Sequence, residues 1–205
     1  MGLVVIDYGL GNLASIKNMI KKVGGNCEVS SNLSVIERAD KIILPGVGAF
    51  AKGMENLISS GIKPALDKKV LQDKVPLLGI CLGMQLLTKH SEEGDVNGLG
   101  WINAETKKFN LDPDKFKVPH MGWKEIKISN TEHPLLKGID FAPRYYFVHS
   151  YYVSCDNEKN SLAKANYGIT FDCGIMNENI MGLQFHPEKS HRFGMEVMKN
   201  FINNF

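Results

Sequence analysis

A cysteine stands between two glycines in the stretch GICLGMQ, where an apolar run ends. Residues 75–80 are typical of a buried strand, and residues 82–89 have the pattern of a helix. Glycines on both sides of Cys81 allow a sharp strand-to-helix turn that presents a reactive side chain. A helix N-terminus there favours a thiolate and offers N–H groups to an oxyanion. We therefore predict that Cys81 is a nucleophile, the alternative being a cysteine that only fills the core.

A histidine that could serve as its base lies in the stretch MGLQFHPEKS. His186 ends an apolar run, Pro187 fixes the backbone, and Glu188 follows two residues later. In extended chain, residues i and i+2 lie on one face, so Glu188 could accept the ring N–H of His186 and orient its other nitrogen. The alternative is a solvated turn after an edge strand.

A glycine-rich turn in ILPGVGAF supplies a third element. Backbone N–H groups of Gly46, Val47 and Gly48 could point at an anion, although the stretch could also be a tight turn before a helix. Cysteine, His-x-Glu and turn together fill the roles of nucleophile, base, orienter and oxyanion site in acyl transfer.

The first half of the chain must place these groups, and it repeats one pattern three times. Residues 3–6, 41–44 and 75–80 are strand-like, and each run leads through a glycine turn into a helical pattern. The helical patterns begin near Asn12 and cover residues 50–58 and 82–89. This alternation predicts an α/β fold, with a mostly parallel sheet flanked by helices.

The second half lacks long helices between its strand-like runs, which predicts an antiparallel portion of the sheet. These runs are residues 126–128, 145–153, 162–165, 168–171 and 180–185, and an amphipathic helix over 193–201 closes the chain. Because no repeat or linker interrupts the sequence, we predict one domain over residues 1–205.

Composition is that of an ordinary globular protein, with 43% apolar residues, 22% charged residues and a net charge of +2 over 205 residues. No basic cluster suggests nucleic acid, and neither a signal peptide nor a membrane-length apolar run is visible, so we expect a cytoplasmic protein with no membrane partner. The four cysteines are far apart without a C-x-x-C pair, so we expect free thiols, no metal site and no cofactor.

Six motifs in order now carry a resemblance to a known family. GICLGMQLL with FHPEKS resembles the class I (triad) glutamine amidotransferases. IDYGLGNLAS, LPGVGAF, KVPHMGW and YFVHSYYV are similar to the glutaminase subunits of imidazole glycerol phosphate synthases, and the likeness runs from residue 7 to about 190.

The resemblance implies a flavodoxin-like fold and a glutaminase that releases glutamate and ammonia. It assigns Cys81 as nucleophile, His186 as general base and acid, and Glu188 as orienter. The oxyanion would be held by the N–H of Leu82 and by the turn at residues 46–48. Substrate contacts implied by the family pattern are Gln85, Glu93, His149, Ser150 and Tyr151. A carboxylate suits the substrate ammonium, although Glu93 could equally lie at a solvated helix end.

The resemblance also implies a partner, a (β/α)8-barrel cyclase subunit that forms a heterodimer with the glutaminase and carries ammonia to a ribonucleotide in histidine biosynthesis. Interface residues implied in this way are Asn12, Trp123, Tyr146 and Lys189. Core packing is the alternative for the two aromatic residues. Asn12 could simply cap the first helix.

Two departures leave the ammonia acceptor open. Lys124 stands where the family motif commonly has asparagine, and it would add a positive charge beside the interface. The stretch from residue 98 to 123 also resembles paralogues that supply ammonia for amidination of a surface sugar. A catalytically silent regulatory module and a stand-alone cysteine hydrolase are rival interpretations.

Overall fold

A central sheet whose first part is entirely parallel organises the molecule. The computed structural model describes residues 2–139 and 142–205. The parallel strands lie in the order β2-β1-β3-β4-β13, which is the 2-1-3-4-5 order of flavodoxin-like folds. Their bounds are β1 (Leu3–Ile6), β2 (Glu28–Ser30), β3 (Lys41–Gly46), β4 (Leu77–Cys81) and β13 (Ile180–Leu183).

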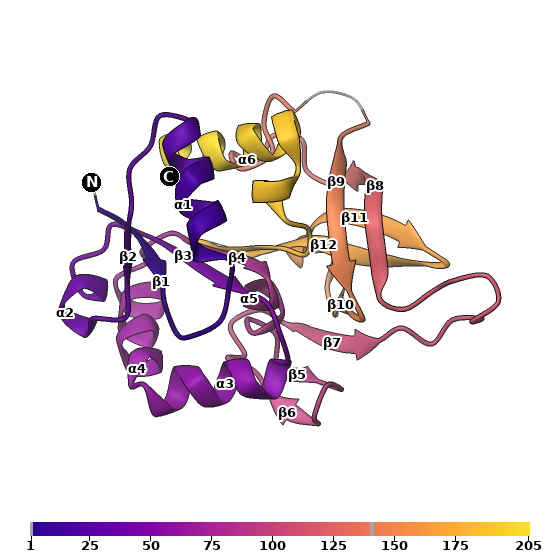
Figure 1. The fold of residues 1–205 in the computed structure, drawn as a ribbon, viewed down its shortest axis with the longest axis horizontal. Coiled ribbons are helices and arrows are strands. Elements are labelled where there is room, and N and C mark those ends of the chain that lie inside the picture. The colour runs from indigo at the N-terminus through magenta and orange to yellow at the C-terminus, as the bar shows by residue number, and fades with distance from the viewer. Residues whose placement is uncertain (1, 140–141) are drawn as a thin grey trace.

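Helices cover both faces of this parallel part (Figure 1). Side chains of β1 alternate between two apolar clusters, with Leu3 and Val5 in one and Val4 and Ile6 in the other, so both faces of the strand are buried. The first cluster lies under α1 (Leu13–Lys22) and α6 (His191–Asn204). The second lies under α2 (Leu33–Ile36), α3 (Phe50–Ser59) and α4 (Ile62–Asp67), which continues into a π-helical turn at Lys68–Gln72. No helix in the described part of the chain is long and apolar enough to cross a membrane.

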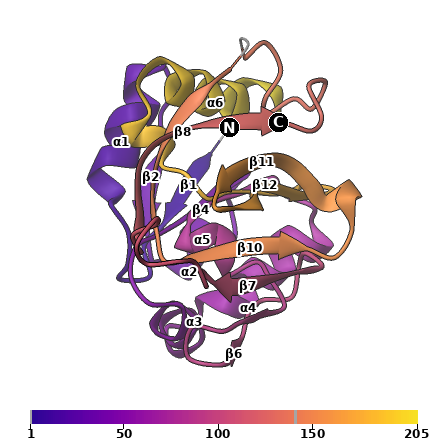
Figure 2. The same ribbon diagram turned by 90° about the vertical axis from the view of Figure 1, so that its right-hand side faces the viewer.

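Strands that pair antiparallel, except for the parallel pair of β5 and β7, extend the sheet beyond β13 and face the viewer in Figure 2. The main path continues through β12 (Ile169–Asn177), β10 (Tyr151–Cys155), β7 (Ala104–Lys108), β5 (His90–Ser91) and β6 (Val96–Asn97). A branch leaves β12 through β11 (Ser161–Tyr167), β8 (His120–Ile128) and β9 (Arg144–His149). The sequence prediction of a parallel sheet with an antiparallel portion is confirmed.

Several predicted elements differ in extent, and two of them position the site. The helix expected over 82–89 is only α5 (Leu82–Gln85), because the carbonyls of Leu86 and Leu87 accept N–H groups of Leu99 and Trp101. The strand expected over 145–153 is two strands. Its first part, β9, pairs with β8, and its second part, β10, pairs with β7, so the chain changes partner at Ser150.

Candidate active site

The carboxyl ends of three neighbouring parallel strands bring the predicted chemical groups together. Gly46 at the end of β3 is directly opposite Cys81 at the end of β4. On its other side β4 pairs with β13, where Leu183 is opposite Ile80 and the chain continues to His186. Ligands of open α/β sheets bind at this edge, outside the carboxyl ends of the strands.

Cys81 occupies a strained turn that its flanking glycines make possible. Its φ of 55° lies in the left-handed region, which costs a non-glycine residue about 1–3 kcal/mol. A Cβ on Gly83 would run into the carbonyl of Leu44, and one on Gly79 would lie 2.7 Å from the carbonyl oxygen of Gly83. Cys81 as a whole is 7% exposed. With α5 only four residues long, the groups available to an anion are the N–H groups of this single turn, without the dipole of a long helix.

His186 and Glu188 form a buried ion pair behind the thiol. Nδ1 of His186 lies 2.8 Å from Oε1 of Glu188. The expected extended His-x-Glu pair is wrong in its backbone, since a 3₁₀ turn at Pro187–Lys189 brings the two side chains together. Ser190 Oγ donates to the carbonyl of His186 at 2.6 Å and holds this turn. Nε2 of His186 and Oε2 of Glu188 have no hydrogen-bond partner among the described residues.

The charge of His186 follows from its neighbours. Burial by itself would lower the pKa of His186, but the nearby Cys81 and the hydrogen-bonded Glu188 carboxylate outweigh burial and raise the pKa to about 10. The ring is therefore an imidazolium at neutral pH. The proton on Nε2 of His186 could pass to the leaving group of a substrate that Cys81 attacks.

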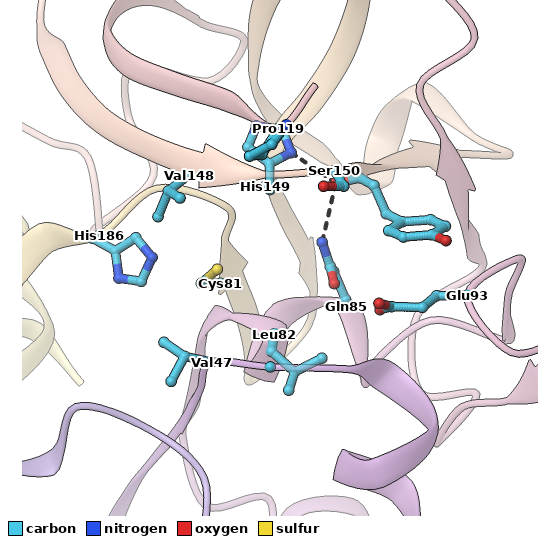
Figure 3. A pocket seen from close by; sticks show the side chains of 12 residues that line it. Val47, Cys81, Leu82, Gln85, Glu93, Pro119, Val148, His149, Ser150 and His186 are labelled. Atoms are coloured by element: carbon cyan, nitrogen blue, oxygen red, sulfur yellow. Dashed lines mark hydrogen bonds between the residues drawn. The ribbon is translucent and has the colours of Figure 1, made fainter. Parts of the chain in front are cut away.

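A cavity of about 270 Å³ opens in front of this pair, below the range of roughly 300–1,000 Å³ typical of drug-sized ligands, so it suits a small metabolite. Figure 3 shows Cys81 between His186 on one side and Gln85 and Glu93 on the other. The residues that line it are Val47, Gly48, Cys81, Leu82, Gln85, Glu93, Pro119, Val148, His149, Ser150, Tyr151 and His186.

The glycine turn forms the floor of the cavity beside the thiol. Gly48 has a φ of 117°, which favours glycine, and Val47 is exposed towards the opening. Gly46 lies behind the lining. A Cβ there would clash with the hydroxyl of Tyr8 and lie 2.8 Å from Cβ of Leu82.

Gln85 and Glu93 provide polar atoms at the end of the cavity away from His186. Nε2 of Gln85 donates to the carbonyl of Tyr151 at 3.1 Å, which leaves Oε1 as an acceptor. Oε2 of Glu93 accepts the N–H of Phe50 at 2.9 Å, so its carboxylate is held against the first turn of α3. The alternative of a freely solvated Glu93 is therefore wrong.

The opposite wall is built where β9 passes into β10, at His149, Ser150 and Tyr151. Nδ1 of His149 lies 2.7 Å from the carbonyl of Tyr151, and Nε2 lies 3.0 Å from Nδ1 of His120. A carbonyl only accepts, so His149 donates through Nδ1 and accepts from His120. Burial is the main cause that lowers the pKa of His149 to about 3 and that of His120 to about 4, so both rings are neutral.

Three of the predicted interface residues gather on the surface. Trp123 is opposite Tyr146 across β8 and β9, with 6.1 Å between ring centroids, and Nζ of Lys189 lies 5.7 Å from the Tyr146 ring centroid. Trp123 is 38% exposed, so core packing does not explain it. Asn12 caps α1 instead, accepting the N–H of Ser15 at 3.4 Å. The interface role of all four residues stays a prediction.

Lys124 does not add its charge to this surface. Side chains alternate along β8, and Nζ of Lys124 lies 5.7 Å from the ring centroid of Tyr167, on the face opposite to Trp123.

Two residues that hydrogen-bond to residues lining the cavity, His120 and Gln184, were not predicted from the sequence. Gln184 lies two residues before His186, so the two-residue period of a strand could have placed both on one face. Within residues 2–139 and 142–205, no group of three or more His, Cys, Asp or Glu side chains is arranged to hold a metal ion.

Comparison with known proteins gives consistent matches. Residues 4–205 match the family model described as glutamine amidotransferase class-I. The chain is 52% identical to imidazole glycerol phosphate synthase subunit HisH 2 of Methanococcus maripaludis and 48% identical to the subunit HisH 2 of Pseudomonas aeruginosa, each time over 98% of both chains. The structure of PurLQS from Thermotoga maritima superposes with a TM-score of 0.76 at 16% identity, covering 99% of this chain and 98% of that one, which shows the fold alone.

Proposed function

Since the chain belongs to the class I glutamine amidotransferase family, and is therefore a glutaminase, we propose that Cys81, His186 and Glu188 are its catalytic triad. One observation carries this assignment. Nδ1 of His186 is 2.8 Å from Glu188, while its Nε2 is buried without a partner on the side of the ring that faces the cavity and Cys81 (Figure 3).

The proposed reaction begins with attack of the Cys81 thiolate on the side-chain carboxamide of L-glutamine. A C–S bond forms, and the carbonyl becomes an oxyanion that the N–H of Leu82 and an N–H of the turn at residues 46–48 stabilise. His186 then donates its proton from Nε2 to the leaving nitrogen, the C–N bond breaks, and ammonia departs.

A glutamyl thioester on Cys81 remains, and His186 is now neutral. It accepts a proton from water, the resulting hydroxide attacks the thioester, and the C–S bond breaks to release glutamate and the thiolate. Gln85 and Glu93 hold the ammonium of the substrate, because an acceptor oxygen and a carboxylate complement a cation there. His149, Ser150 and Tyr151 form the opposite wall of the substrate site.

We propose that the chain, acting as one domain, is the glutaminase subunit of an imidazole glycerol phosphate synthase in histidine biosynthesis. The names of relatives that share about half of its residues support this role, and they imply a partner subunit. Because ammonia is mostly protonated in neutral water, and ammonium is no nucleophile, the product needs a shielded path. A (β/α)8-barrel cyclase docked over the exposed Trp123 and Lys189 and the half-buried Tyr146 would supply it.

The test is glutamate release by the purified chain with the cyclase subunit of the same organism, with and without the ribonucleotide ligand of that cyclase. We expect little release by the free chain and a large, ligand-dependent rise in the complex. No rise with an active cyclase would overturn the assigned pathway. Labelling of Cys81 by acivicin, a glutamine analogue, tests the triad separately, and absence of labelling in the complex would overturn it.

A second role keeps the same chemistry with another acceptor. Both relatives carry the numeral 2 in their names, which favours considering a paralogue that supplies ammonia for amidination of a surface sugar. Growth of a histidine-requiring strain that lacks its own glutaminase subunit separates the two roles. Rescue supports histidine biosynthesis, and failure despite good expression favours the sugar pathway.

A further inference from the structure

Gln184 carries a buried side-chain amide next to Cys81, and the proposed reaction gives Gln184 no role. Its side chain is 0% exposed, and its Nε2 lies 3.7 Å from Sγ of Cys81. Strand register explains the contact. Leu183 of β13 is opposite Ile80 of β4, so the next residue along each strand, Gln184 and Cys81, are neighbours.

The hydrogen-bond network fixes which end of the Gln184 amide faces the sulfur. Nε2 of Gln85 donates to the carbonyl of Tyr151 at 3.1 Å and to Oε1 of Gln184 at 3.0 Å. A carbonyl accepts only, so the NH₂ group of Gln85 must be on this side, and the group of Gln184 that meets it must be its oxygen. The NH₂ group of Gln184 is therefore left to donate to Sγ.

We propose that Gln184 is a hydrogen-bond donor to the Cys81 thiolate and that it links the substrate-binding Gln85 to the nucleophile. This inference rests on the proposed function. A thiolate with so little access to water needs a donor to replace hydration, and a charge-assisted hydrogen bond is stronger than a neutral one. An amide suits the task, because it donates without titrating and does not compete with His186 for the proton.

The geometry gives the two ends of Gln184 separate effects. Its N–H acts on the sulfur, so its loss should lower kcat and make the thiolate harder to form. Its Oε1 holds Gln85, whose remaining oxygen faces the substrate site, so loss of that acceptor should raise KM. A residue that only filled space would change neither quantity selectively.

Gln184→Glu tests the donor, since it keeps the size and the acceptor for Gln85 but puts an oxygen beside Sγ. In the complex with the cyclase subunit, we expect kcat for glutamine hydrolysis to fall about 10- to 100-fold, the factor that one hydrogen bond to a charged group supplies, with KM within about threefold. The midpoint of the pH profile for alkylation of Cys81 by iodoacetamide should move up by about one pH unit or more.

Gln184→Met removes donor and acceptor together without adding charge. We expect the same upward movement of the alkylation midpoint and, in addition, a clear rise in KM. The matched control is Asn200→Asp, which changes another buried amide, one that donates to the carbonyls of Leu135 and Lys137. Asn200→Asp should lower the melting temperature while leaving the alkylation midpoint unchanged.

An unmoved midpoint in either folded Gln184 variant overturns the proposal. Should both fail to fold, the unmodified protein decides, because the side-chain amide signals of Gln184 in a ¹⁵N spectrum must shift when Cys81 is alkylated. Signals that stay in place also overturn it. Failure of the proposed function is distinguishable, since the unmodified protein would then not be labelled at Cys81 by acivicin.

Discussion

His186 and His149 line the same cavity, 1% and 6% exposed, yet only the ring of His186 is charged at neutral pH. Burial disfavours the cation in both. His186 has Cys81 and the Glu188 carboxylate beside it, so its pKa rises, whereas burial at His149 outweighs the hydrogen bond to the Tyr151 carbonyl, so its pKa falls. Similar burial is thus compatible with a charged ring on one wall and a neutral ring on the other.

This contrast extends to the two regions that supply the walls. The edge of parallel strands β3, β4 and β13 contributes the strained cysteine, the glycine turn and the ion pair, to which the proposed reaction assigns bond formation, oxyanion stabilisation and proton transfer. The antiparallel strands β8, β9 and β10 contribute neutral hydrogen-bonding groups towards the cavity and the exposed Trp123 towards solvent. We interpret the parallel edge as the part that catalyses the reaction and the antiparallel strands as the part that recognises substrate and partner.

Among substitutions at the edge of the parallel strands, Cys81→Ala should lower activity the most. Removal of a triad nucleophile costs about 10⁶-fold in kcat, so glutamine hydrolysis should become undetectable. Binding of the cyclase and synthesis from added ammonia should persist, because Cys81 is buried at the bottom of the cavity and not on the exposed surface around Trp123. Both activities are measured on the same complex, and loss of ammonia-dependent synthesis would mean that Cys81 is structural.

Glu188→Gln, at the same edge, should lower kcat less than Cys81→Ala does. The amide oxygen can still accept from Nδ1 of His186, but the negative charge that stabilises the imidazolium is lost, a change that costs about 10⁴-fold in a related triad. Since Glu188 helps to raise the pKa of His186, the basic limb of the kcat profile should also move to lower pH. An unchanged pH profile with a large loss of activity would contradict this explanation.

Trp123→Ala tests whether the antiparallel strands bind the partner subunit. An exposed tryptophan at the centre of an interface typically contributes about 2 kcal/mol, so the Kd for the cyclase should rise about 30-fold, as measured by titration calorimetry. Lys124→Ala, on the opposite face of the same strand, is the matched control and should change Kd less than threefold. Equal effects of the two variants would mean that the partner docks elsewhere.

The parallel edge was predictable from sequence because its signals are local. Cys81 with its glycines and His186 with Glu188 each lie within a few residues, and strand ends of a parallel sheet meet at one edge. The antiparallel wall depends on distant pairing. Without the family resemblance, nothing local indicates that the chain changes partner at Ser150, or that His120 reaches His149 across β8 and β9.

The predicted length of the helix after Cys81 was wrong for the same reason, because it depends on pairing with a distant segment. The apolar pattern after Cys81 fits a helix, but N–H groups from residues 98–102 take the carbonyls that would continue it. Gln184 could have been recognised from its two-residue spacing to His186. Its role depends on Gln85 and Tyr151, which only the folded chain brings to it.

The smallest expected effect concerns the neutral pair His120 and His149. It is a change in how the free energy of unfolding depends on pH. The folded pKa values of His120 and His149 lie at about 4 and about 3, below the 6.5 of an unfolded histidine. Between pH 6.5 and about 4 the unfolded chain therefore binds more protons than the folded chain at these sites. Their contribution to the free energy of unfolding is complete above pH 6.5 and is lost as the pH falls, by at most about 1.4 kcal/mol per pH unit for each ring.

His120→Phe removes one of these two groups while keeping an aromatic ring between Phe147 and Tyr167. Urea unfolding at pH 7 and pH 5 should show a smaller difference in the variant than in the unmodified protein, because one fewer ring takes up a proton on unfolding. Tyr167→Phe, which leaves both histidines in place, should keep the original difference. An undiminished difference in His120→Phe would mean that His120 is already charged in the folded state, and the neutral wall opposite His186 would then be wrong.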